Sequence, residues 1–147
     1  MKDQDAVDYL RKGFNCAQSV LTVFAKEKGI PEVQALKIAG GFGAGMGRLE
    51  QTCGAVTGAY MALGLHYGKS IGDTDEQRDT MYALVRKFDA SFRDKFATTC
   101  CRELINCDLL TEEGRKYYHE NAVNEKVCAR CVRESVKIVE QLLAEAV

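Results

Sequence analysis

The amino-acid sequence predicts an all-α protein: a compact bundle of six or seven helices with one glycine-rich connector. Two observations carry this prediction. Apolar residues recur at steps of three and four along most of the chain, and no segment keeps the apolar–polar alternation of a strand. With 147 residues, 46% of them hydrophobic, the chain can bury a core of its own, and no repeat or linker divides it. We therefore expect a single domain over residues 1–147.

Glycines and capping residues divide the first third of the chain into helices. Asn15 suits an N-cap, Gly29 ends a helix, and Pro31 suits a first turn. The expected helices span about residues 3–12, 15–28 and 31–39. Residues 40–47 contain five glycines, and each interior glycine costs a helix about 1 kcal/mol relative to alanine. This segment is therefore the predicted connector.

Longer helices follow the connector. Thr52 suits the N-cap of the first of them, and Thr111 suits the start of a later one. Steps of three and four separate the apolar residues of the longest helix, Met81, Leu84, Val85, Phe88 and Phe92. The expected helices span about 53–67, 73–96 and 124–146, with another beginning near residue 111 and a short turn over 101–105.

Charge and hydropathy exclude several classes of function. The chain carries 20 basic and 21 acidic residues, so it lacks the excess positive charge that binding to a nucleic-acid backbone requires. Its longest apolar stretch, residues 55–65, is too short to span a bilayer. The acidic N-terminal segment does not resemble a signal peptide. We therefore expect a cytoplasmic protein that binds no nucleic acid and does not insert into a membrane. The sequence is compatible with a homo-oligomer.

Seven cysteines are the most informative residues. In a reducing compartment they serve as buried thiols, metal ligands or redox thiols. Cys53 follows the expected cap Thr52, and Cys16 follows the expected cap Asn15. A helix N-terminus favours a thiolate, so both positions predict activated cysteines. The alternative is that Cys53 is a small buried hydrophobic residue beside a tightly packed helix.

Three further features allow either a functional or a structural interpretation. Gly45, Gly47 and Gly54 would let the backbone approach a cofactor or ligand, another helix, or Cys53; otherwise the connector needs them for positive φ angles. The C-x-x-C at residues 128–131 suits redox or metal chemistry, or leaves Cys131 as a core thiol. Glu50 is either a proton acceptor for Cys53 or an exposed loop carboxylate.

Four motifs in order resemble the redox-active protein family named for its C_GCAxxG_C_C pattern. They are NCAQSVL at 15–21, GMG at 45–47 with TCGAVTGA at 52–59, CREL at 101–104, and Cys128 with VR at 132–133. The pattern's Gly-Cys-Ala reads Cys-Gly-Ala in this chain. The resemblance implies four characteristic cysteines, Cys16, Cys53, Cys101 and Cys128. It leaves Cys100, Cys107 and Cys131 without a role.

The resemblance implies redox activity, and two hypotheses follow. In the first, Cys53 is the thiolate and Cys16, Cys101 or Cys128 resolves it by disulfide exchange with an unknown redox partner. This hypothesis requires no cofactor. In the alternative, Cys16, Cys53, Cys101 and Cys128 hold a metal ion or an iron–sulfur cluster. The distances among these four sulfur atoms would distinguish the two hypotheses.

Overall fold

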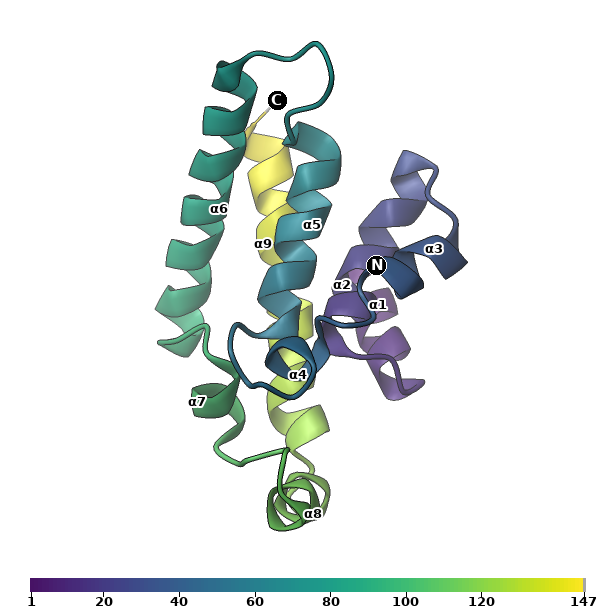
Figure 1. Ribbon diagram of the computed structural model, residues 1–147, viewed down its shortest axis with the longest axis vertical. Helices are drawn as coiled ribbons and strands as arrows, with labels where there is room; N and C mark the ends of the chain where they lie inside the picture. Colours follow the sequence, from purple (N-terminus) through teal and green to yellow (C-terminus); the bar gives the residue numbers. More distant parts are fainter. Residues whose placement is uncertain (147) are drawn as a thin grey trace.

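The computed structural model describes residues 1–146 and confirms the all-α prediction (Figure 1). Its helices are α1 (Lys2–Arg11), α2 (Cys16–Ala25), α3 (Glu32–Ile38), α4 (Gly43–Met46), α5 (Gly54–Tyr67), α6 (Asp75–Phe96), α7 (Cys101–Ile105), α8 (Glu112–Glu120) and α9 (Ala129–Glu145). A 3₁₀ turn (Lys26–Lys28) follows α2, and a π-helical turn (Asn124–Cys128) precedes α9. None of these helices is both long and apolar enough to cross a membrane.

Helix α5 is the centre of the fold. Figure 1 shows it beside α6 and α9, with the α1–α3 layer on its other side. Its buried residues are small or medium in size and cover several of its faces: Gly54, Ala55, Val56, Gly58, Ala59, Ala62 and Leu63. A Cβ atom added to Gly58 would lie 2.8 Å from the carbonyl oxygen of Ala17, so the backbones of α2 and α5 are nearly in contact. The small residues of segment 52–59 therefore allow α2 and α5 to pack closely together.

Helix α6 covers α5 and α9 with the apolar stripe that the sequence predicts. Leu84, Phe88 and Phe92 are buried, and the rings of Phe88 and Phe92 lie 6.0 Å apart between centroids. Burying a side chain of this size contributes about 1.5–3 kcal/mol. This helix anchors the end of the molecule where Cys100 and Cys101 follow it.

The glycine-rich connector forms a left-handed turn. Ala44, Gly45, Met46 and Gly47 all have φ angles between 55° and 69°. The N–H of Met46 donates to Phe42 O (3.3 Å), as in one turn of a helix of inverted hand. Left-handed backbone costs an L-residue about 1–2 kcal/mol, which explains the glycines at two of the four positions. The prediction of a connector with positive φ angles is confirmed.

The start of α5 differs from the prediction. Thr52 does not cap the helix, because it forms an isolated antiparallel bridge with Cys100. The N–H of Cys53 donates to Thr99 O (2.8 Å), and the N–H of Cys101 donates to Gln51 O (2.6 Å). These bonds keep the backbone extended through Cys53, so the helix begins one residue later and Cys53 is itself the N-cap residue. The bridge also brings the Cys53 and Cys101 segments together.

Candidate functional site

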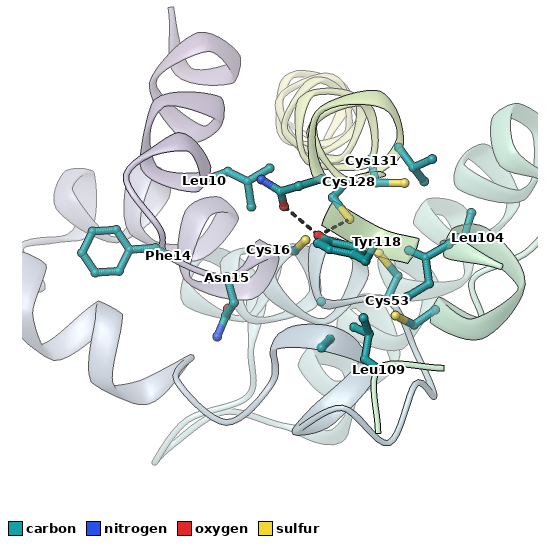
Figure 2. A pocket seen from close by; sticks show the side chains of 16 residues that line it. Leu10, Phe14, Asn15, Cys16, Cys53, Leu104, Leu109, Tyr118, Cys128 and Cys131 are labelled. Atoms are coloured by element: carbon teal, nitrogen blue, oxygen red, sulfur yellow. Dashed lines mark hydrogen bonds between the residues drawn. The ribbon is translucent and has the colours of Figure 1, made fainter. Parts of the chain in front are cut away.

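Three of the four cysteines of the family pattern lie at N-terminal ends of helices. Cys16 is the first residue of α2, Cys101 is the first of α7, and Cys53 is the N-cap residue of α5. Cys128 is the last residue of the π-helical turn that continues into α9. All four line one cavity of about 120 Å³ (Figure 2). Partial positive charge collects at helix N-termini, so the fold gathers three such ends around sulfur. The sequence indicates this position for Cys16 and Cys53, and the structure adds Cys101.

Cys131 is a fifth thiol in this cavity, and the family pattern does not include it. Its side chain is only 1% exposed and lines the cavity three residues beyond Cys128 (Figure 2). On a helix, residues three apart lie on the same face. The C-x-x-C spacing was therefore the signal that could have placed Cys131 beside Cys128.

The cavity wall is uncharged. Among the described residues, no Lys, Arg, His, Asp or Glu lines it. Its remaining members are mainly apolar: Leu10, Phe14, Asn15, Ala44, Gly54, Leu104, Ile105, Leu109, Tyr118, Asn124 and Val127. A thiolate here is stabilised by neutral hydrogen-bond donors and helix ends, because no cation is within the cavity.

Cys53 and Cys131 form the first thiol pair. Hydrogen bonding from the Cys131 thiol lowers the pKa of Cys53 below its ordinary value, against the opposing effect of burial. The backbone N–H groups of Ala55 and Val56 lower the pKa of Cys53 further. The same contact raises the pKa of Cys131, together with burial and the negative charge on Cys53. Within this pair Cys53 is therefore the more acidic thiol and Cys131 the less acidic one.

Cys16 and Cys128 form a second pair. A hydrogen bond from Cys16 lowers the pKa of Cys128; burial opposes this, and a hydrogen bond with Tyr118 reinforces it. The same bond, burial and the charge on Cys128 raise the pKa of Cys16. The Tyr118 hydroxyl oxygen lies 3.3 Å from the Cys128 sulfur and 2.8 Å from Asn124 Oδ1. In this pair Cys128 is the more acidic thiol.

Cys101 stands apart from both pairs although it lines the same cavity. Burial raises the pKa of its thiol far above the ordinary value, and the negative charges on Cys53, Cys128 and Glu50 reinforce this effect. Cys101 is therefore a weakly acidic thiol beside Cys53 and Cys128, whose pKa values are lowered. Cys100 and Cys107 are half-buried and do not line the cavity.

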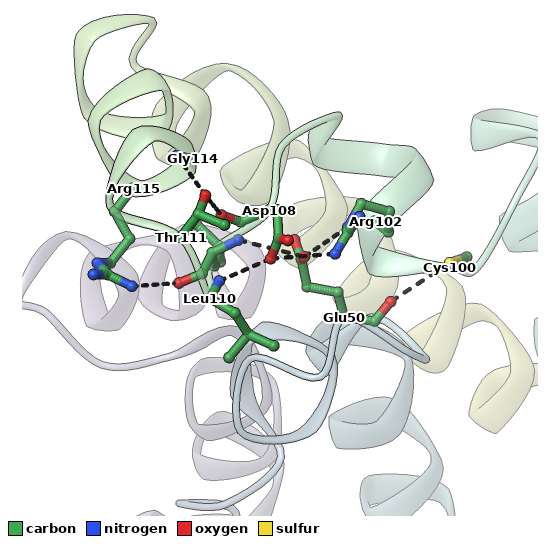
Figure 3. A network of polar contacts seen from close by, with 9 residues as sticks. Glu50, Cys100, Arg102, Asp108, Leu110, Thr111, Gly114 and Arg115 are labelled. Atoms are coloured by element: carbon green, nitrogen blue, oxygen red, sulfur yellow. Dashed lines mark hydrogen bonds and ion pairs between the residues drawn. The ribbon is translucent and has the colours of Figure 1, made fainter.

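Glu50 is buried, so the interpretation as an exposed loop carboxylate is wrong. Its side chain is 1% exposed and accepts from Arg102 Nε (2.7 Å) and the N–H of Leu109 (3.4 Å) (Figure 3). Arg102 also pairs with Asp108 at 3.2 Å. This network lies outside the cavity lining, and Glu50 Oε2 has no hydrogen-bond partner. Glu50 joins the segment before Cys53 to the segment after Cys101.

The three glycines proposed to contact a cofactor lie in different surroundings. Gly54 lines the cavity, and a Cβ atom there would lie 3.1 Å from both Ala17 N and Phe42 O. Gly45 packs against the backbone of Glu50 and Gln51, and a Cβ atom on Gly47 would meet nothing within 4 Å. Of the three, only Gly54 is placed beside the sulfur atoms.

The fold and the cavity define the class of this molecule: an all-helical protein with a buried thiol centre. The chain belongs to the family described as "Putative redox-active protein (C_GCAxxG_C_C)", whose sequence profile matches residues 14–142. This span includes all seven cysteines, and the family prediction from the four motifs is confirmed. No curated protein and no solved structure matches the chain.

Proposed function

We propose that the protein is a dithiol–disulfide redox protein in which Cys53 is the attacking thiolate and Cys131 resolves it. The observation that carries this proposal is that both thiols line one cavity, where hydrogen bonding between them lowers the pKa of Cys53 and raises the pKa of Cys131. A thiolate with a neighbouring thiol is the minimum requirement for a reversible disulfide. The partner supplies the disulfide and is reduced.

The exchange takes place in two steps. The Cys53 thiolate attacks one sulfur of the partner disulfide, forms a mixed disulfide and releases the other partner sulfur as a thiolate. Cys131 then loses its proton to that thiolate and attacks Cys53, which forms the Cys53–Cys131 disulfide and releases the second partner thiolate. Two electrons pass from the protein thiols to the partner.

The protonation states of the pair suit this order of events. The hydrogen bond to Cys53 and the charge on Cys53 are among the causes that raise the pKa of Cys131. Both disappear when Cys53 enters a mixed disulfide, because its sulfur is then neutral. Attack by the first thiol therefore activates the second. Cys16, Cys101 and Cys128 were the resolving candidates from the sequence; the cavity favours Cys131 instead.

Disulfide mapping tests the proposal. We expect oxidation with excess glutathione disulfide, followed by alkylation and trypsin, to join the peptide 49–69 to the peptide 131–133. Trypsin cleaves after Lys126, Arg130 and Arg133, so Cys128 and Cys131 lie on separate peptides. The Cys107→Ser variant, altered outside the cavity, should give the same cross-link. The proposal fails if Cys53 stays reduced or pairs only with Cys100 or Cys107.

Removing the Cys131 thiol should slow the reaction of Cys53 with iodoacetamide. A hydrogen bond to a charged group is worth about 1.5–3 kcal/mol, so Cys131→Ala should raise the pKa of Cys53 by about one to two units. A more basic thiolate is also a better nucleophile, so the rate at pH 7 should fall about 3- to 15-fold. Cys131→Ser keeps a donor and should stay close to wild type. Equal rates in the two variants would contradict this assignment.

Metal binding by Cys16, Cys53, Cys101 and Cys128 is the alternative, and it has a separate test. In residues 1–146, no three His, Cys, Asp or Glu side chains are placed to hold one metal ion. We therefore propose chemistry that needs no resident cofactor. Metal analysis of anaerobically purified protein distinguishes the two: a stoichiometric metal that Cys53→Ser removes and Cys107→Ser retains would favour binding.

A further inference from the structure

The uncharged cavity has few groups that can stabilise a negative charge on Cys128. Apart from the cysteines, its polar side chains are Asn15, Tyr118 and Asn124. Asn15 is already occupied, because its oxygen accepts from Gln18 N (2.9 Å) and its amide nitrogen donates to Gly40 O (3.1 Å). Tyr118 and Asn124 are therefore the remaining polar side chains of the cavity wall that can stabilise a negative charge on the Cys128 sulfur.

Tyr118 lies between Asn124 and Cys128. Its oxygen is 2.8 Å from Asn124 Oδ1 and 3.3 Å from the Cys128 sulfur (Figure 2). Asn124 and Cys128 are the two ends of the π-helical turn that precedes α9. Such wide turns are rare and occur frequently at functional sites. Both hydrogen-bond partners of the Tyr118 hydroxyl, Asn124 and Cys128, therefore lie on one short segment.

Counting hydrogens gives two arrangements of this group. A phenol has one hydrogen, and a carboxamide oxygen only accepts. When the hydroxyl donates to Asn124 Oδ1, Cys128 must be a thiol that donates to the hydroxyl oxygen. When Cys128 is a thiolate, the hydroxyl donates to sulfur, and the Asn124 amide turns so that its nitrogen donates to the hydroxyl oxygen. The thiol proton leaves to water in this change.

We infer that Tyr118, oriented by Asn124, is a positioning residue that stabilises a thiolate at Cys128, which makes Cys128 a second reactive thiol of the cavity. This inference rests on the proposed function. Four further titratable groups interact by charge with the Cys16–Cys128 pair: the thiols of Cys53, Cys101, Cys107 and Cys131. None of them is a cation, so the hydroxyl and the Cys16 thiol are the side-chain donors available to Cys128.

The pH dependence of Cys128 alkylation tests this inference. Iodoacetamide labelling is followed on the tryptic peptide 127–130, which contains Cys128 alone. In Tyr118→Phe we expect the apparent pKa of Cys128 to rise by about one unit and its rate at pH 7 to fall about threefold. Tyr117→Phe is the matched control, because Tyr117 is 44% exposed and does not line the cavity.

Asn124→Ala provides a second variant that keeps the tyrosine. It should raise the pKa of Cys128 as well, by less than Tyr118→Phe, because the hydroxyl loses its orienting donor. An unchanged Cys128 profile in folded Tyr118→Phe would overturn the inference, as would a lowered pKa in Asn124→Ala. The readout does not depend on disulfide formation. If Cys53 stays reduced in the disulfide mapping, the proposed function fails, but the alkylation profile of Cys128 still tests the role of Tyr118.

Discussion

Gly45→Ala is expected to destabilise the protein by about 2–5 kcal/mol, and Gly47→Ala by only about 1–2 kcal/mol. Both glycines have left-handed backbone, with φ angles of 65° and 60°. Alanine therefore has a similar conformational cost at both positions. The two sites differ in the room available for a side chain. A Cβ atom on Gly45 would lie 2.5 Å from Gln51 N and Glu50 Cα, whereas one on Gly47 would meet nothing within 4 Å.

Urea unfolding of the two variants measures this difference. Because the backbone angles match, the excess destabilisation of Gly45→Ala reports the overlap with residues 50–51 alone. The affected segment leads directly into Cys53, so we also expect slower alkylation of Cys53 in Gly45→Ala. Equal losses of stability in the two variants would show that residues 50–51 move away without cost.

Alkaline pH should destabilise the reduced protein strongly, by up to about 4 kcal/mol per pH unit above pH 9. In the unfolded chain all five cavity thiols ionise near about pH 8.5. In the folded protein the pKa values of Cys16, Cys101 and Cys131 are raised, and those of Cys53 and Cys128 are lowered. The folded state then keeps three cavity protons that the unfolded state loses; the pKa of Cys107, outside the cavity, is raised by a smaller amount and acts in the same direction.

The sign of the effect follows from these directions. A group with a raised folded pKa stabilises the protein below the unfolded pKa, and this contribution is lost as the pH rises. Cys53 and Cys128 act in the opposite direction, since their contribution is present above the unfolded pKa and is lost as the pH falls through their folded pKa. Stability should therefore be greatest near about pH 8.5.

Denaturant unfolding at several pH values, under anaerobic reducing conditions, tests this expectation. The Cys101→Ala variant removes one retained proton, so its slope above pH 9 should be smaller by about 1.4 kcal/mol per pH unit. The absolute stability of this variant will differ from wild type, but the slope reports the proton count. A slope that Cys101→Ala does not change would exclude Cys101 as a retained proton.

The helices were predictable because their signals are local. Periodicity located the stripe of Leu84, Phe88 and Phe92, and Asn15 forms the expected capping box with Gln18. The start of α5 was misplaced because its partner, Cys100, is distant in the sequence. A rule that uses only neighbouring residues predicts Thr52 as a cap, because it contains no information about the bridge to Cys100.

The sequence by itself determined the fold class, the family, the place of the glycine-rich connector and the helix-end positions of Cys16 and Cys53. Each of these depends on neighbouring residues or on short motifs. Only the tertiary structure decided which thiols share a cavity, in which direction their pKa values shift, and that Glu50 is buried. Those properties depend on contacts between helices that are far apart in the chain, such as α5 with α9, and on the loss of water around the sulfur atoms.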